Sequence, residues 1–139
     1  MIFIIAAGLA AVLLSAHSAS ARFASECRNI CLDTTNPNIL ITECTIDGST
    51  TDTQYEWAQF DLNEILAYSP PTFVYKQDGD FSPSCNQCAI DDIAAFTCKC
   101  GPDTPLLDLN TYLADVAGSL CFANNAFGPI CGTSTSLRC

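Results

Sequence analysis

The chain has 139 residues, and its 15 acidic residues outnumber its 5 basic residues, which gives a formal net charge of −10. Nucleic acids and anionic membrane surfaces attract clustered positive charge, whereas the basic residues here are scattered, so the composition argues against both partners. The 10 cysteines of so short a chain are typical of an exported protein whose small core is cross-linked by disulfide bonds.

The first 21 residues have the pattern of a secretion signal. An apolar run from Ile2 to Leu14 is followed by small residues that end in Ala19-Ser20-Ala21, as a signal peptidase requires. A membrane anchor is the alternative, but it needs about 20 unbroken apolar residues. We therefore expect residues 1–21 to be removed, no membrane span in the mature chain, and a secreted, extracellular protein that begins at about Arg22.

Beyond the signal, apolar and polar residues alternate in short runs that predict β-strands. These runs are residues 40–46, 55–60, 72–75, 93–100 and 120–122. Residues that favour turns separate them at 36–38, 47–49, 70–71, 77–80 and 101–103. No segment predicts a long helix, so the expected fold class is all-β with short helical turns. The alternation also predicts that Trp57 belongs to the core.

One series of landmarks occurs twice in the same order. The first copy contains Phe23, Cys27, Cys44, Phe60-Asp61-Leu62-Asn63 and Leu66-Ala67. The second copy contains Phe81, Cys85, Cys100, Leu107-Asp108-Leu109-Asn110 and Leu113-Ala114. Two such units can cover each other's apolar faces. We therefore predict one domain over residues 22–122, built from repeats at about 23–76 and 81–122, followed by a cysteine-containing tail at 123–139.

The Asp-Leu-Asn motif of each repeat has a structural interpretation. Asp61 and Asp108 suit the start of a helical turn, where a carboxylate oxygen accepts hydrogen bonds from exposed backbone N–H groups. In the first repeat, Leu62, Ile65 and Leu66 then face inward. A catalytic carboxylate pair is the alternative, but general acid and base roles need different surroundings, and these two aspartates share the same local sequence.

Cysteine pairing follows in part from the repeat. Cys27 with Cys44 and Cys85 with Cys100 occupy matching places, so each pair is expected to join the first strand of its repeat to the second. A further bond between Cys88 and Cys98 needs a bulge in that hairpin, because residues three apart point oppositely in a regular strand. Pairing of Cys85 with Cys98 is the competitor. The sequence leaves the partners of four cysteines open: Cys31, Cys121, Cys131 and Cys139.

The duplicated motifs resemble the cyanovirin-N homology (CVNH) family. The likeness is strongest over Leu107–Phe122 and extends over about Phe23–Phe122. It implies an elongated domain with internal pseudo-two-fold symmetry, in which each half contains strands from both repeats. Members are lectins that bind mannose-rich glycans without a metal. The implied mechanism is hydrogen bonding of sugar hydroxyls in one shallow pocket per half, with avidity from the pair.

The resemblance also implies which residues line the two pockets. The first pocket corresponds to Arg22, Ser25, Glu26, Thr45, Asp47, Asp115, Val116 and Ala117, where Ala117 replaces an acidic residue of the family. The second pocket falls near Tyr68, Ser69, Asp80, Ser84 and Asp103. Two prolines, Pro70 and Pro71, replace an acidic residue and a glycine there, so we expect this second pocket to be remodelled or lost.

Other functions fit the sequence less well. Cys85, Cys88, Cys98 and Cys100 have spacings compatible with zinc, but exported thiols usually oxidise. The only histidine, His17, lies in the signal, so the mature chain has no histidine for catalysis or metal binding. We expect no cofactor, no metal and no enzymatic activity, with glycans or glycoproteins as partners. A disulfide-rich structural or protein-interaction module with this fold is the alternative.

Overall fold

The computed structural model describes residues 23–46, 54–122 and 128–139. The expected secretion signal and the expected turn at 47–49 lie outside these residues, as do two of the candidate site residues, Arg22 and Asp47. Within the described segments, no helix combines the length and apolar character that a membrane span requires.

The two repeats form corresponding elements in the same order, with an α-helix at the start of the first and a 3-10 turn at the start of the second. The first contains a short helix α1 (Phe23–Glu26), strands β1 (Cys27–Leu32), β2 (Ile39–Thr45) and β3 (Tyr55–Asp61), a 3-10 turn η1 (Leu62–Glu64), and strands β4 (Leu66–Ser69) and β5 (Thr72–Tyr75). The second contains η2 (Ser82–Ser84), β6 (Asn86–Ile90), β7 (Ala95–Lys99), β8 (Leu106–Asp108), η3 (Leu109–Thr111), β9 (Leu113–Val116) and β10 (Ser119–Phe122). Two short strands follow in the tail, β11 (Ile130–Cys131) and β12 (Thr133–Ser134).

The predicted strands are observed with small differences, except at the run 93–100. Strand β7 begins only at Ala95, because the Asp91 carboxylate accepts hydrogen bonds from the N–H groups of Ile93, at 3.1 Å, and Ala95, at 2.7 Å. This side chain shapes a turn that the alternation did not reveal.

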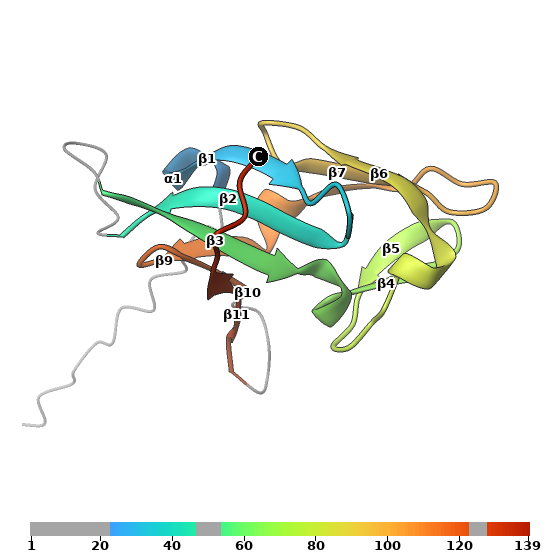
Figure 1. The fold of residues 1–139 in the computed structure, drawn as a ribbon. Helices are drawn as coiled ribbons and strands as arrows, with labels where there is room; N and C mark the ends of the chain where they lie inside the picture. The colour runs from blue at the N-terminus through green and yellow to red at the C-terminus, as the bar shows by residue number, and fades with distance from the viewer. Residues whose placement is uncertain (1–22, 47–53, 123–127) are drawn as a thin grey trace, which may run out of the picture.

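The repeats exchange strands to make two halves. Antiparallel β1, β2 and β3 lie against the β9–β10 hairpin, because α1 contacts β9 and β10 contacts β3. We call this group half A. Antiparallel β6, β7 and β8 associate with the β4–β5 hairpin through contacts between β5 and β8, and we call that group half B. Figure 1 shows the strands of the two halves toward opposite ends of the molecule, so the exchange expected from the resemblance is present.

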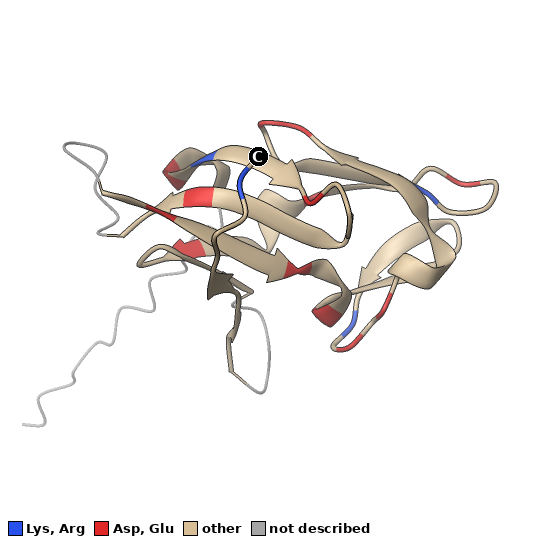
Figure 2. Cartoon of the chain, in the orientation of Figure 1, with Lys and Arg blue, Asp and Glu red and all other residues tan. Residues whose placement is uncertain are grey.

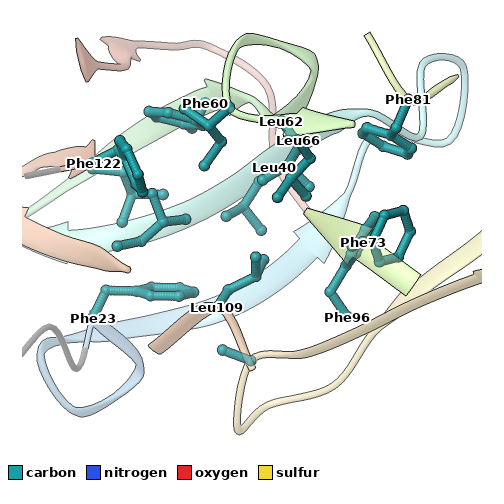
Figure 3. Packing of buried hydrophobic residues seen from close by; sticks show 14 of the residues in the cluster. Phe23, Leu40, Phe60, Leu62, Leu66, Phe73, Phe81, Phe96, Leu109 and Phe122 are labelled. Carbon is teal, nitrogen blue, oxygen red and sulfur yellow. The ribbon is translucent and has the colours of Figure 1, made fainter. Parts of the chain in front are cut away.

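The core is continuous through both halves. Fully buried phenylalanines occur at matching places in the two repeats, including Phe23 and Phe81. Figure 3 shows Phe73, Phe81 and Phe96 together in half B, with leucines between them and the phenylalanines of half A. Phe73 comes from the first repeat, and its ring centroid lies 5.5 Å from that of Phe81 and 5.4 Å from that of Phe96. The core therefore joins the repeats to each other.

The Asp-Leu-Asn motifs begin helical turns, as predicted. The carboxylate of Asp61 accepts a hydrogen bond from the N–H of Asn63 at 2.9 Å, and Asp108 does the same for Asn110 at 2.9 Å. The following side chains that were expected to face inward, Leu62, Ile65 and Leu66, are buried. The two aspartates thus have the structural role of helix-capping residues.

The asparagine of each motif has a role that the sequence did not reveal. Asn63 Oδ1 accepts a hydrogen bond from the N–H of Ser82 at 3.1 Å, and Asn63 Nδ2 donates to Ser82 Oγ at 2.9 Å. In the second repeat, the equivalent Asn110 accepts through Oδ1 from the N–H of Ala24 at 3.0 Å. Its Nδ2 donates to the Ile93 carbonyl oxygen at 2.7 Å. Each asparagine therefore holds the first turn of the other repeat.

We expect Asn63→Ala and Asn110→Ala each to lower the free energy of unfolding by about 1 to 3 kcal/mol, because part-buried donors and acceptors lose their partners. Urea unfolding of the oxidised protein measures the loss. Asn86→Ala is the matched control, because Asn86 is exposed on β6. Equal stability of all three variants would contradict the bridging role.

Five disulfide bonds join the ten cysteines, and three of the pairs match those expected from the repeat: Cys27 with Cys44, Cys85 with Cys100, and Cys88 with Cys98. The bulge expected for the third pair is present, because the β6–β7 register shifts between Asn86 and Ala89. One of the two residues between them, Gln87, has φ of 49°. The other bonds join Cys121 to Cys131 and Cys31 to Cys139, so both staple the tail to the domain.

The expectation for Trp57 is wrong. On β3 the buried side chains are Ala58 and Phe60, while Trp57 lies on the opposite face and is half-buried. The alternation is real, but Glu56, Ala58 and Phe60 form the face that points toward the core. Trp57 instead lies under the tail, with the guanidinium carbon of Arg138 at 4.8 Å from its ring centroid.

Candidate functional site

The first candidate pocket lies at the end of half A where α1, β2 and the β9–β10 hairpin meet. Ser25 and Glu26 are exposed on α1, which packs against β9. Thr45 is the last residue of β2 and is 3% exposed. Asp115 and Val116 end β9, and Ala117 follows them in the turn. Six of the eight residues named for this pocket are therefore described.

Asp115 is the polar centre of this arrangement. Its Oδ2 accepts a hydrogen bond from Thr45 Oγ1 at 2.9 Å, and its Oδ1 accepts one from the N–H of Gly118 at 2.9 Å. The first contact joins residues that lie 70 positions apart in the sequence. The carboxylate is thereby fixed in position at the junction of the two repeats, while its residue stays partly exposed.

The tight turn between β9 and β10 brings backbone and apolar groups close to Asp115. Ala117 has φ of 53° and Gly118 has φ of 85°, as in the two-residue hairpin turns that suit twisted strands. A Cβ on Gly118 would lie 3.4 Å from Ile46 Cγ1. Val116 is 53% exposed and Ile46 is 40% exposed, so apolar side chains adjoin the polar centre. Sequence reasoning missed Gly118 and Ile46, although a glycine after Val116-Ala117 is a turn signal.

Burial changes the acidity of Asp115. Desolvation raises the pKa of its carboxyl group above the ordinary value of 3.8, although the hydrogen bonds from Thr45 and Gly118 act in the opposite direction. The carboxylate also lies beside the Cys27–Cys44 disulfide, with the ligand-type atoms of these three residues within 4.8 Å of one another. Both sulfurs are bonded to each other, so neither is a thiolate that could bind a metal.

The raised pKa predicts how stability depends on pH. The folded state favours the protonated Asp115, so this residue's contribution to the free energy of unfolding should fall as pH rises from the ordinary value through the raised pKa. Asp115→Asn should remove this contribution. Urea unfolding of both proteins across this pH range measures the difference between them. A difference that stays constant with pH would contradict the prediction, and Glu64, whose pKa burial also raises, contributes equally to both proteins.

In the second candidate pocket, two of the expected residues bond to each other. The Tyr68 hydroxyl donates to Asp103 Oδ2 in a short hydrogen bond, and it lies 3.1 Å from the Cys100 carbonyl oxygen. The bond to Asp103 raises the pKa of Tyr68 to about 12. Tyr68 occupies in half B the place that Asp115 occupies in half A, because both are the third residue of matching strands. A partly exposed acceptor in half A therefore corresponds to a donor in half B that already has a partner.

The other residues named for the second pocket are spread over its surroundings. Ser69 ends β4, Ser84 ends η2, and both are exposed. The N–H of Asp80 donates to the Asn63 carbonyl oxygen at 3.0 Å, which holds the preceding segment along η1. Among the described residues, none of these three forms a side-chain hydrogen bond with Tyr68 or Asp103. Pro70 and Pro71 led us to expect that the second pocket is remodelled or lost, and this stays a prediction. The Tyr68–Asp103 hydrogen bond gives it a physical basis.

A family comparison decides the classification. A family model of the CVNH domain matches residues 23–121. The chain belongs to the CVNH family. CVNH members are carbohydrate-binding lectins, and the family is known for this function rather than for catalysis. A search of curated protein sequences finds no match.

Solved structures of other CVNH proteins share the fold. GzCVNH from Gibberella zeae has 20% sequence identity and a TM-score of 0.60, and the alignment covers 73% of this chain and 97% of that one. TbCVNH from T. borchii has 20% identity and a TM-score of 0.59 over 72% of this chain and 97% of that one. A variant of MoCVNH3, with 16% identity and a TM-score of 0.59 over 73% and 96%, was solved in complex with (N-GlcNAc)4.

The alternative sites considered from sequence are less well supported. The four cysteines with zinc-like spacing form two disulfide bonds, so the thiolates that zinc requires are lacking. Acidic residues are spread over the loops and strand ends of this CVNH domain, with few basic residues among them (Figure 2). This distribution agrees with the argument against an anionic partner.

Proposed function

We propose that this protein binds carbohydrate non-covalently at the end of half A, in the region of Asp115. The observation that carries the proposal is the fixed, partly exposed carboxylate of Asp115, held by Thr45 and Gly118. An ionised carboxylate offers about four acceptor positions, so it keeps capacity for a sugar hydroxyl. Because its orientation is set before the ligand arrives, binding loses little entropy in ordering it.

The surroundings of Asp115 suit a sugar. Exposed Glu26 on α1 adds acceptor oxygens, and exposed Val116 and Ile46 add apolar surface for the C–H groups of a sugar ring. The fold relatives include a protein solved with (N-GlcNAc)4, and the family resemblance implies mannose-type glycans, so both classes are candidates. The binding residues carried over from the resemblance include Arg22, Ser25 and Asp47, of which only Ser25 lies among the described residues.

Binding is proposed at one end of the domain only. In half B, the Tyr68–Asp103 hydrogen bond occupies the groups that correspond to the polar centre of half A. A protein with one site gains no avidity within the monomer, so its affinity for a branched glycan equals that of the single pocket. A stoichiometry of one ligand per chain is the corresponding expectation.

The proposed place of action is outside the cell. Residues 1–21 have the secretion-signal pattern, and the ten cysteines are all paired in disulfide bonds, which persist in oxidising compartments. Terminal sequencing of the exported protein tests the cleavage, which is expected to leave a chain that begins at about Arg22.

A glycan array with the oxidised mature protein tests the function, followed by titration calorimetry with mannose-type, glucose-type and chitin-type oligosaccharides. Binding with one site per chain supports the proposal. No response to any of these glycans would overturn it and favour the alternative, a structural or protein-interaction module with this fold.

A further inference from the structure

The last ten residues follow a defined path over the domain. Ile130 and Cys131 pair with β10, and the N–H of Gly132 donates to the Leu120 carbonyl oxygen at 2.8 Å. The chain then passes to the other sheet of half A, where β12 extends the sheet beyond β3. Figure 1 shows this segment running across β3 and β2 to the C-terminus beside β1. We call residues 130–139 the C-terminal strap.

The strap covers the outer face of half A. The N–H of Thr135 donates to the Trp57 carbonyl oxygen at 2.9 Å, and the Arg138 guanidinium lies over the Trp57 ring. Ile41 is only 1% exposed, although it lies on the face of β2 that points away from Leu40 and the core. Its carbonyl oxygen is 4.0 Å from Cys139 Sγ. The strap thus covers part of this face and one open edge of its sheet.

The two disulfide bonds of the strap differ in their surroundings. Cys131 is exposed, but its partner Cys121 is only 2% exposed. The bond at the end of the strap joins exposed Cys139 to half-buried Cys31. The other three bonds each contain a cysteine that is 1% exposed or less. Among the five bonds, the Cys31–Cys139 bond therefore has the most accessible pair of sulfurs.

This difference decides which bond an external thiol can open. Thiol–disulfide exchange requires access to one sulfur and expulsion of the other as a thiolate. Attack on exposed Cys131 would expel a thiolate from buried Cys121, and burial without a positive partner disfavours a thiolate. Attack on Cys139 expels the thiolate of Cys31 at the outer face of β1, where water can reach it.

We propose that the Cys31–Cys139 disulfide is a redox latch that holds the C-terminal strap over the β3 edge and Trp57. A dithiol reductant attacks Cys139 Sγ, forms a mixed disulfide and expels the Cys31 thiolate, which takes up a proton. The second thiol of the reductant then closes a cyclic disulfide and releases Cys139 as a thiol. Two electrons pass from the reductant to the protein, and residues 133–139 leave the sheet while the Cys121–Cys131 bond keeps residues 130–132 in place.

Release of the strap exposes an edge strand and an aromatic side chain. A free edge strand presents unpaired N–H and C=O groups, and the β3 edge already accepts a strand, since Thr133 faces Gln59 and Ser134 faces Ala58. Trp57 adds a large aromatic side chain beside this edge. The latch therefore controls access to a surface that is distinct from the proposed sugar site around Asp115.

Graded treatment of the oxidised protein with dithiothreitol tests the latch. Alkylation and peptide mass mapping should find Cys31 and Cys139 labelled at lower reductant concentrations than any other cysteine. Hydrogen exchange at the Thr135 amide should then speed up, while exchange at the Gly132 amide stays slow, because only Thr135 lies beyond the anchored part. Trp57 is the only tryptophan, so its emission should shift to longer wavelength as the covering residues leave.

The double variant Cys31→Ser/Cys139→Ser supplies the released state without reductant. It should show fast exchange at Thr135 and the shifted Trp57 emission, and dithiothreitol at the low concentrations should change neither. Labelling of buried cysteines at the same reductant concentration as Cys139 would overturn the proposal. Continued protection of Thr135 in the double variant would overturn it as well, because pairing of β12 alone would then hold the strap.

Discussion

Replacing Asp115 with alanine is expected to weaken glycan binding about 10- to 150-fold. A hydrogen bond to a charged group contributes about 1.5 to 3 kcal/mol, and each 1.4 kcal/mol changes the dissociation constant about tenfold. The alanine removes the acceptor for a sugar hydroxyl. It also leaves the Thr45 hydroxyl and the Gly118 N–H without the partner that positions them. Calorimetric titration with the best oligosaccharide from the array measures the change.

Two further variants separate loss of the acceptor from loss of the fold. Asp115→Asn keeps an acceptor oxygen for Gly118 and can donate to the Thr45 hydroxyl, but it loses the charge, so its affinity should fall about tenfold or less and stay above that of Asp115→Ala. Asp103→Asn alters the corresponding polar pair in half B and should leave affinity unchanged, because the proposed site lies in half A and the Tyr68 hydroxyl already bonds to Asp103. Weaker binding by Asp103→Asn than by Asp115→Ala would contradict the proposal, because it would mean that the sugar binds in half B.

The fold could be predicted because the repeat fixes the same helical turns, bulges and disulfide positions twice. The matching cysteines form equivalent disulfide bonds and the Asp-Leu-Asn positions have the same local structure in both copies. The matching phenylalanines Phe23 and Phe81 are both buried at the start of a helical turn. Asp61 and Asp108 cap equivalent turns with φ of −82° in both. The bulges agree too, since Asn29 and Gln87 lie two residues after equivalent cysteines and have φ of 53° and 49°. Local signals that occur twice constrain the fold more than either copy could alone.

The features that escaped prediction depend on contacts between distant segments. A polar side chain such as Asn110 shows no sign in the sequence that it bonds to Ala24, which lies 86 residues earlier. The same holds for Tyr68 and Asp103, which lie 35 residues apart and form a side-chain hydrogen bond. The alternation of its strand predicts a core position for Trp57, whereas the tail that lies over this side chain has no counterpart in the repeat. The pairing of Cys31 with Cys139 spans 108 residues. Only the assembled fold brings these groups together.

Phe73→Ala is expected to give the largest loss of stability, about 3 to 5 kcal/mol. Phe73 is 5% exposed, and its ring packs edge-on against Phe81 and at 35° to Phe96. Truncation removes the transfer free energy of the ring and leaves a cavity that two neighbouring rings fill only in part. Typical domains have a free energy of unfolding of about 5 to 15 kcal/mol, so this loss is a large fraction of the total. Urea unfolding with intact disulfides measures it.

The same variant tests whether the exchange of strands makes the two halves one cooperative unit. Phe73 belongs to the first repeat, whereas Phe81 and Phe96 belong to the second, so a cavity at this point weakens the contact that joins them. Val74→Ala is the matched control, because Val74 is the next residue on β5 and is 38% exposed. If Trp57 in half A reports the same lowered midpoint as circular dichroism of the whole domain, the halves unfold together. An unchanged Trp57 transition would mean that half A folds independently of the core that Phe73 completes.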